Sequence, residues 1–176
     1  MIFKETKLKG SYTIELDKKE DERGFFARVF CLDEFKENNL NTNFVQANIS
    51  MSSKKGTLRG LHFQTAPYEE DRLFRVTRGS VFDVIVDIRP DSPTYLHHFT
   101  SKLSARNYTM LYIPQGFAHG FLTLENNTEV MYMVSQFYKP EFAHGIRYND
   151  PALNIAWPIE INVISETDKN FPDFKI

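Results

Sequence analysis

The chain has 176 residues, of which 41% are hydrophobic and 14% aromatic, and this is enough apolar material for one domain with a full core. Its formal charge of -2 lacks the basic excess of a protein whose main ligand is nucleic acid, and the single cysteine, Cys31, excludes an internal disulfide framework. The charged N-terminal segment and the absence of a long apolar run predict a cytoplasmic protein without a membrane span.

Short runs of β-branched and aromatic residues alternate with turn residues along the chain, a pattern typical of an antiparallel barrel or sandwich. We expect strands at residues 11–16, 25–30, 42–49, 75–77, 80–88, 109–113, 121–124 and 129–137. Only residues 32–39 have the composition of a helix. No repeat, low-complexity tract or linker interrupts the sequence, which predicts a single all-β domain over residues 1–176.

Two histidines lie in similar, strand-like settings rich in aromatic residues and glycine. His62 lies in the segment Arg59-Gly60-Leu61-His62-Phe63-Gln64, and His119 lies in a second segment at residues 114–121. Their surroundings indicate an arranged site in a β-barrel. Three uses remain open from these residues alone: the histidines hold a metal, move a proton, or fill the core.

The two segments resemble the two sequence blocks of the cupin barrel, which in many cupins supply an internal metal site. His62 and His119 fit those blocks, but Gln64 stands in place of the second histidine of the pair and Thr123 stands at the late ligand position. A transition metal requires three or four nitrogen, oxygen or sulfur donors. The substitution therefore disfavours a metal site, and we expect no metal or other cofactor.

A closer resemblance covers nearly the whole chain. The motifs that carry it are, in order, Asp21-x-Arg23-Gly24-x-Phe26, Phe44-Val45-Gln46-x-Asn48-x-Ser50, Leu58 to Gln64, Val81 to Thr94, Ile113 to Phe121, Tyr132, Tyr138-x-Pro140, Asp150-Pro151, Trp157-Pro158 and Ser165-x-x-Asp168. By these motifs the sequence resembles the dTDP-4-dehydrorhamnose 3,5-epimerase family. The resemblance implies a metal-independent cupin jelly roll, a homodimer that exchanges N-terminal strands, and epimerisation of a nucleotide-linked 4-keto-6-deoxyhexose for surface polysaccharide or glycoside biosynthesis.

The implied reaction removes a proton from a carbon next to a ketone, so it requires a base, an enolate stabiliser and a proton donor on the opposite face. By motif position, the resemblance implies that His62 is the base, that Asp168 orients its ring, and that Tyr132 is the opposing acid. Without the resemblance, Tyr132 is interpreted as a core aromatic residue and Asp168 as a solvated carboxylate. The sequence does not determine whether C3, C5 or both are inverted.

Two residues depart from the family pattern. Arg72 stands where members usually carry a lysine near the C4 keto oxygen, and it predicts an enolate clamp that cannot carry a proton. The acidic residues 69–71 before it are interpreted as a solvated turn or as partners for Arg72. Arg28 replaces a glutamate that helps the family recognise thymine. Because arginine only donates hydrogen bonds, this replacement suggests a CDP-linked substrate, or at least one in which thymidine is not preferred. The alternative interpretation is a surface arginine on an edge strand.

The remaining family contacts are carried over position by position. The resemblance assigns diphosphate and sugar contacts to Arg23, Arg59 and His119, polar lining to Gln46 and Asn48, and base stacking to Phe26 and Tyr138. In a strand-exchanged dimer, Arg23, Phe26 and Arg28 serve the partner's site. Arg89 is interpreted as a solvated strand end. Two alternative functions remain: a nucleotide-sugar-binding cupin without catalysis, and a metal-dependent cupin enzyme.

Overall fold

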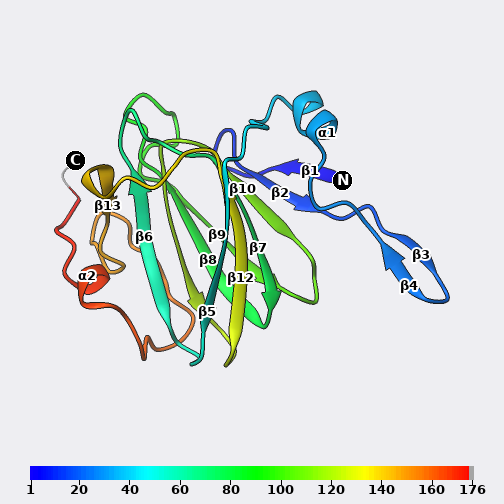
Figure 1. Cartoon of the computed structure of the whole chain (residues 1–176). Helices are drawn as coiled ribbons and strands as arrows, with labels where there is room; N and C mark the ends of the chain where they lie inside the picture. Colours follow the sequence, from blue (N-terminus) through cyan, green and yellow to red (C-terminus); the bar gives the residue numbers. More distant parts are fainter. Residues whose placement is uncertain (175–176) are drawn as a thin grey trace.

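The computed structural model describes residues 1–174, and two antiparallel sheets packed face to face form most of it (Figure 1). The six-stranded sheet has the order β1 (Ile2–Glu5), β2 (Tyr12–Glu15), β10 (Met110–Ile113), β7 (Arg72–Arg78), β12 (Thr128–Val134) and β5 (Gln46–Ser52). The five-stranded sheet has the order β13 (Ala143–Gly145), β6 (Leu58–Gln64), β11 (Phe117–Thr123), β8 (Ser80–Asp87) and β9 (His98–Ser104). The predicted all-β jelly roll is confirmed.

A two-stranded arm, formed by β3 (Lys19–Asp21) and β4 (Gly24–Phe26), extends away from the two sheets (Figure 1). All residues of both strands are exposed. The strand expected at residues 25–30 ends at Phe26, because Phe26 pairs with Lys19 and β3 offers no partner beyond it. Phe25 of the arm makes an edge contact with the ring of Tyr108, with centroids 5.0 Å apart, whereas Phe26 is 69% exposed.

The main core lies between the two sheets. Successive side chains of a strand point to opposite faces, so Phe74 and Val76 of β7 point into this core while Leu73 points to the outer side of the sheet. Val81 and Ile85 of β8 meet them from the five-stranded sheet. Each such fully buried side chain stabilises the fold by roughly 1.5–3 kcal/mol.

The helix expected at residues 32–39 is confirmed as α1 (Leu32–Glu37), and it covers the outer face of the six-stranded sheet. Its Phe35 is fully buried and makes edge contacts with the rings of Phe3 and Tyr112. Asn39 has a φ of 57°, a left-handed conformation that asparagine tolerates, and this ends the helix.

The C-terminal part of the chain covers the outer face of the five-stranded sheet. After the 3-10 turn η1 (Pro140–Phe142) and β13, Ile146 and Leu153 pack with Leu61 of β6. The segment then forms an isolated bridge from Val163 to Thr57 and a short helix, α2 (Glu166–Lys169), beside β6. This return brings α2 to the strand that carries His62.

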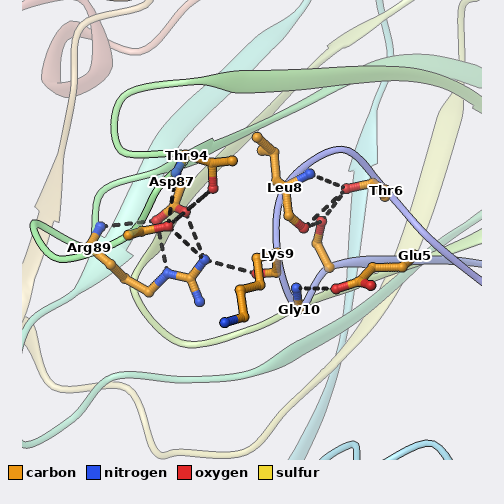
Figure 2. A network of polar contacts seen from close by, with 10 residues as sticks. Glu5, Thr6, Leu8, Lys9, Gly10, Asp87, Arg89 and Thr94 are labelled. Carbon is orange, nitrogen blue, oxygen red and sulfur yellow. Dashed lines mark hydrogen bonds and ion pairs between the residues drawn. The ribbon is translucent and has the colours of Figure 1, made fainter.

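A buried polar network ties the β1–β2 turn to the loop after β8 (Figure 2). The fully buried Asp87 accepts hydrogen bonds from Arg89 Nε (2.8 Å), Ser92 Oγ (2.5 Å) and Thr94 Oγ1 (2.6 Å). Arg89 Nη2 also donates to the carbonyl oxygen of Lys9 at 2.8 Å. The interpretation of Arg89 as a solvated strand end was therefore wrong.

Strand boundaries differ from the sequence prediction where pairing decides them. The strand expected at residues 42–49 runs instead over β5, because β12 pairs with it residue by residue from Gln46 to Ser52. Among residues 1–174, no helix is long and apolar enough to cross a bilayer.

Candidate active site

A cleft with two lobes lies between the sheets, and His62, Arg72 and Tyr132 line both lobes. Lobe 1 has a volume of about 450 Å³, and its polar lining includes Gln46, Asn48, Glu70, Tyr138 and His144. Lobe 2 has a volume of about 430 Å³, and its polar lining includes Ser50, Arg59, His119, Ser165 and Asp168. The three shared residues mark the junction of the lobes.

His62 and Asp168 form a hydrogen-bonded pair, as the resemblance implies. His62 Nε2 lies 2.7 Å from Asp168 Oδ1, and the histidine side chain is 46% exposed while the carboxylate is buried. An ionised carboxylate only accepts hydrogen bonds, so Nε2 carries the proton and donates it. The other ring nitrogen, Nδ1, is therefore the atom with a free lone pair.

The protein fixes Asp168 from two sides. Its backbone N–H donates to the side chain of Ser165, the N-cap of α2, and its Oδ2 accepts from the backbone N–H of Gly60 at 3.0 Å. Burial raises the pKa of Asp168, but the hydrogen bonds from His62 and Gly60 outweigh burial and hold this pKa below its usual value. Asp168 is thus a charged partner for His62 at neutral pH.

Position 60 requires a glycine, because of its backbone conformation and the close approach of neighbouring backbone. Its φ is +109°, and a Cβ atom there would lie 2.6 Å from the carbonyl oxygen of His119. Only glycine permits this close approach of β6 to β11, which also directs the Gly60 N–H toward Asp168.

Tyr132 and His62 enter the cleft from opposite sheets. Tyr132 lies on β12 of the six-stranded sheet, paired with Asn48 and Phe74, whereas His62 lies on β6 of the five-stranded sheet. The guanidinium carbon of Arg72 lies 5.4 Å from the centroid of the Tyr132 ring, a cation–π distance. A proton acceptor and a proton donor thus face the same space from two sides, next to a permanent cation.

Arg72 is itself held by charged and polar groups. Its Nη1 donates to His119 Nδ1 at 2.8 Å, and its Nη2 pairs with Glu70 Oε1. His119 Nε2 lies 2.8 Å from Oδ2 of the fully buried Asp83. Both ring nitrogens of His119 are therefore occupied within the protein, while the residue also lines lobe 2, so its contact with a ligand stays a prediction.

The acidic residues before Arg72 have separate partners. Glu70 pairs with Arg72, as one of the two interpretations expected. Asp71 is instead buried, and it accepts hydrogen bonds from Tyr112 Oη (2.8 Å) and Asn41 Nδ2 (2.6 Å). The solvated-turn interpretation is thus wrong for Asp71.

Gln64, which replaces the histidine of metal-binding cupins, is committed to backbone groups. Its Nε2 donates to the carbonyl oxygen of Tyr68 at 2.8 Å, and its Oε1 accepts from the N–H of Lys139 at 2.7 Å. Within residues 1–174, no group of three or more His, Cys, Asp or Glu side chains is arranged to hold a metal ion. Gln64 therefore organises the loops beside lobe 1.

The structure divides the other predicted binding residues into two groups. Gln46, Asn48 and Tyr138 line lobe 1, and Arg59 lines lobe 2. Three residues lie outside the cleft of their own chain, on or just after the arm: Arg23, Phe26 and Arg28. Arg23 pairs with Asp21, and the guanidinium of Arg28 lies 3.8 Å from Glu34. One chain alone does not bring the two groups together.

Two cleft-associated residues, Asp83 and Phe171, were not predicted from the sequence, and Glu70 was considered only as one of the acidic partners of Arg72. Glu70 lies two positions before Arg72, a spacing that puts both on one side of an extended chain. Asp83 meets His119 only through the pairing of β8 with β11, which the sequence does not give. Phe171 makes an edge contact with His62, with ring centroids 6.0 Å apart.

Comparisons with known proteins agree on one family. The family model described as dTDP-4-dehydrorhamnose 3,5-epimerase matches residues 5–175. A protein of that name from Methanothermobacter thermautotrophicus is 44% identical over 172 residues, which cover 96% of this chain and 92% of the relative. The crystal structure of the Elizabethkingia anophelis enzyme of that name has a TM-score of 0.96 and 40% identity, covering 99% of this chain and 96% of the other. The Bacillus anthracis enzyme, solved with TDP and PPi bound, has a TM-score of 0.94 and 38% identity, covering 98% and 99%.

Proposed function

The chain belongs to the dTDP-4-dehydrorhamnose 3,5-epimerase family, and on this basis we propose how its cleft epimerises a nucleotide-linked 4-keto-6-deoxyhexose in deoxysugar biosynthesis. The observation that carries the proposal is the His62–Asp168 pair facing Tyr132 across a cleft that also holds Arg72. Family membership favours this reaction over a non-catalytic binding cupin and over a metal-dependent cupin enzyme.

Proton removal falls to His62 Nδ1, the ring nitrogen with the free lone pair. The base takes the proton from a carbon next to the C4 ketone, and the electrons of the broken C–H bond move onto the keto oxygen to give an enolate. Asp168, buried and hydrogen-bonded to Nε2, stabilises the imidazolium that forms. The charged guanidinium of Arg72 lies in the same cleft and donates to the enolate oxygen.

Inversion is completed by Tyr132 from the opposite sheet. Its phenol gives a proton to the enolate carbon on the face away from His62, and the C4 ketone re-forms. The phenolate that remains lies beside the Arg72 cation; it takes a proton from solvent and the His62 imidazolium gives one to solvent, which resets both groups. Because C3 and C5 flank the same ketone, the same groups serve either carbon.

Exchange in heavy water separates the two proton transfers. We expect His62→Ala to abolish deuterium wash-in at the α carbons of a 4-keto-6-deoxy sugar nucleotide, followed by NMR. Tyr132→Phe should retain wash-in and lose inversion, because it removes only the opposing donor. His144→Ala, a histidine that lines lobe 1 on β13, is the matched control for the loss of an imidazole. Full wash-in by the His62 variant contradicts the assignment of the base.

The nucleotide is proposed to be CDP, from the chemistry of Arg28. Arginine offers donors that suit the N3 and O2 acceptors of cytosine, whereas thymine has a hydrogen on N3. The Arg28 side chain is 66% exposed, and its pairing with Glu34 at 3.8 Å is weak, so its donors are accessible. Calorimetry with CDP and dTDP tests the proposal: tighter dTDP binding by the wild type overturns it, and Arg28→Glu should reverse the preference.

We propose a homodimer in which the arm of one chain completes the cleft of the other. Phe26 on the arm is 69% exposed, and the β5 edge of the six-stranded sheet exposes Ile49 and Met51. Each apolar surface has no cover within residues 1–174, and a second copy provides cover for both.

Mixing two inactive variants tests this arrangement. Phe26→Ala removes the arm's aromatic ring, and His62→Ala removes the base, so each homodimer should have little activity. Heterodimers formed by unfolding and refolding the two together should regain up to a quarter of the wild-type activity in a statistical mixture. Activity no higher than the sum of the separate variants, together with a monomeric mass by light scattering, overturns the shared site.

A further inference from the structure

Arg72 is anchored at both ends of its guanidinium, although it lies in the cleft. Its side chain is only 16% exposed, and it pairs with Glu70, which is 13% exposed, through Nη2. Its Nη1 donates to His119 Nδ1 across the space between the sheets. A guanidinium has five N–H donors, so these two contacts leave three for an oxygen of the substrate.

The anchor on His119 fixes the state of that ring. Arg72 has no lone pair to offer, so His119 Nδ1 accepts and carries no proton. Nε2 therefore carries the proton and donates it to Asp83 Oδ2. Burial lowers the pKa of His119 and outweighs the raising effect of Asp83, with smaller lowering contributions from Arg72 and His62, so the ring stays neutral at physiological pH. The buried Asp83 thus sets the tautomer that Arg72 requires.

We propose that Glu70 and His119 are positioning residues that hold Arg72 as a pre-oriented donor to the enolate oxygen. This proposal rests on the epimerase function proposed above. Arginine loses side-chain rotamer entropy when it is ordered, and with two anchors this loss occurs before the substrate binds. The benefit therefore falls on the chemical step, in which negative charge develops on the oxygen.

Glu70 and Arg72 are matched to each other. A lysine at position 72 has three N–H donors on a compact ammonium group, and bonds to Glu70 and His119 leave only one. Glu70 then neutralises much of the charge that the enolate needs. An arginine keeps three donors and its planar orientation while it is paired. The carboxylate at position 70 therefore supports an arginine and opposes a lysine.

A double-mutant cycle tests this match, because the expected effect of Glu70→Gln on kcat has opposite signs in the two backgrounds. Wash-in and epimerisation rates are measured for the wild type, Glu70→Gln, Arg72→Lys and the double variant. We expect Glu70→Gln to lower kcat about tenfold in the wild-type background with KM changed less than twofold, and to raise kcat in the Arg72→Lys background. Glu69→Gln, which removes the neighbouring carboxylate, should leave both constants unchanged.

Equal effects of Glu70→Gln in both backgrounds, or no effect in the wild type, overturn the proposal. The ring nitrogens of His119 give a second readout that needs no turnover. Nitrogen-15 NMR, assigned with His119→Gln, should show Nε2 protonated and Nδ1 accepting, and Arg72→Met should shift the Nδ1 resonance. An Nδ1-protonated ring overturns the anchor whatever the activity. Absence of wash-in by the wild type with these NMR signals intact overturns the epimerase function and leaves the anchor standing.

Discussion

Replacing the Asp168 carboxylate by an amide tests the central pair of the cleft, because Asp168→Asn keeps size and shape while it removes the charge. Asp168 accepts two hydrogen bonds, one from His62 Nε2 at 2.7 Å and one from the Gly60 N–H at 3.0 Å. If the new amide oxygen stays on Gly60, the amide nitrogen donates to His62 Nε2 and moves the ring proton to Nδ1, where the base is needed. If the amide turns over, two N–H groups face each other at Gly60.

Both orientations have a cost that the structure allows us to estimate. Loss of a charge-assisted hydrogen bond to the imidazolium costs about 1.5–3 kcal/mol, and a wrong tautomer or an unsatisfied buried N–H costs about 1–3 kcal/mol more. Together they amount to about 2.5–6 kcal/mol in the transition state, which is roughly a 10²- to 10⁴-fold fall in kcat. The KM should change little, because Asp168 acts through His62.

The assay is deuterium wash-in at the α carbons, followed by NMR at saturating substrate, with the melting temperature of each variant measured beside it. Asp173→Asn is the control, because Asp173 lies in the same C-terminal segment, is 61% exposed and pairs with Arg147. Wild-type exchange by the Asp168 variant at an unchanged melting temperature refutes the role of the pair. A loss of exchange in the Asp173 variant as large as in the Asp168 variant refutes the specificity of the effect.

Two further predictions concern the scaffold. A Cβ at Gly145 would lie 2.1 Å from the Phe171 ring that contacts His62, so Gly145→Ala should shift the C-terminal segment and lower kcat about tenfold. Wash-in kinetics measure this fall, and Phe171→Ala in the same background should restore part of the rate. Burial raises the pKa of Asp87, but the hydrogen bonds it accepts, led by that from Arg89, lower this pKa to about 2. The ionised carboxylate therefore contributes fully to the free energy of unfolding above about pH 4, and this contribution is lost as the pH falls toward 2. Asp87→Asn should therefore cost about 2 kcal/mol at pH 7, a fall of about 4–8 °C in melting temperature, and flatten the acid limb of a stability-against-pH curve; an unchanged acid limb contradicts this account.

The strands that were predicted best have one face in the core and one outside it, or are apolar throughout. β8 (Ser80–Asp87) was predicted to within one residue, because five of its eight residues are β-branched or aromatic and apolar and nearly all of it is buried. β9 (His98–Ser104) was missed, because its sequence mixes polar and apolar residues without strict alternation. The four-residue helix α2 was also missed, because its packing against β6 and the Ser165 cap hold it in place, and so short a segment has little helix propensity of its own.

The site was predictable to the level of residue roles and no further. The motif resemblance identified the His62–Asp168 pairing, which the structure places at hydrogen-bonding distance, but no spacing in the sequence joins residues 106 positions apart. The two anchors of Arg72 come from different parts of the fold. Glu70 precedes Arg72 on the chain, while His119 reaches it from the other sheet. An acidic partner for Arg72 among residues 69–71 could be expected from the sequence, whereas the second anchor, His119, could not.

The positions of the two predicted base-stacking residues bear on how many chains make one site. Tyr138 lies at lobe 1 with 65% of its surface exposed, and Phe26 lies on the arm with 69% exposed. A base held by one ring alone keeps its other face in water, so half of the stacking contribution is lost. In this structure the arm continues from the end of β2 and points away from the two sheets, and the pairing of β2 with β1 and β10 fixes where the arm begins (Figure 1). We therefore expect the second ring to come from another copy of the chain, and with it Arg28, so that base preference becomes a property of the dimer.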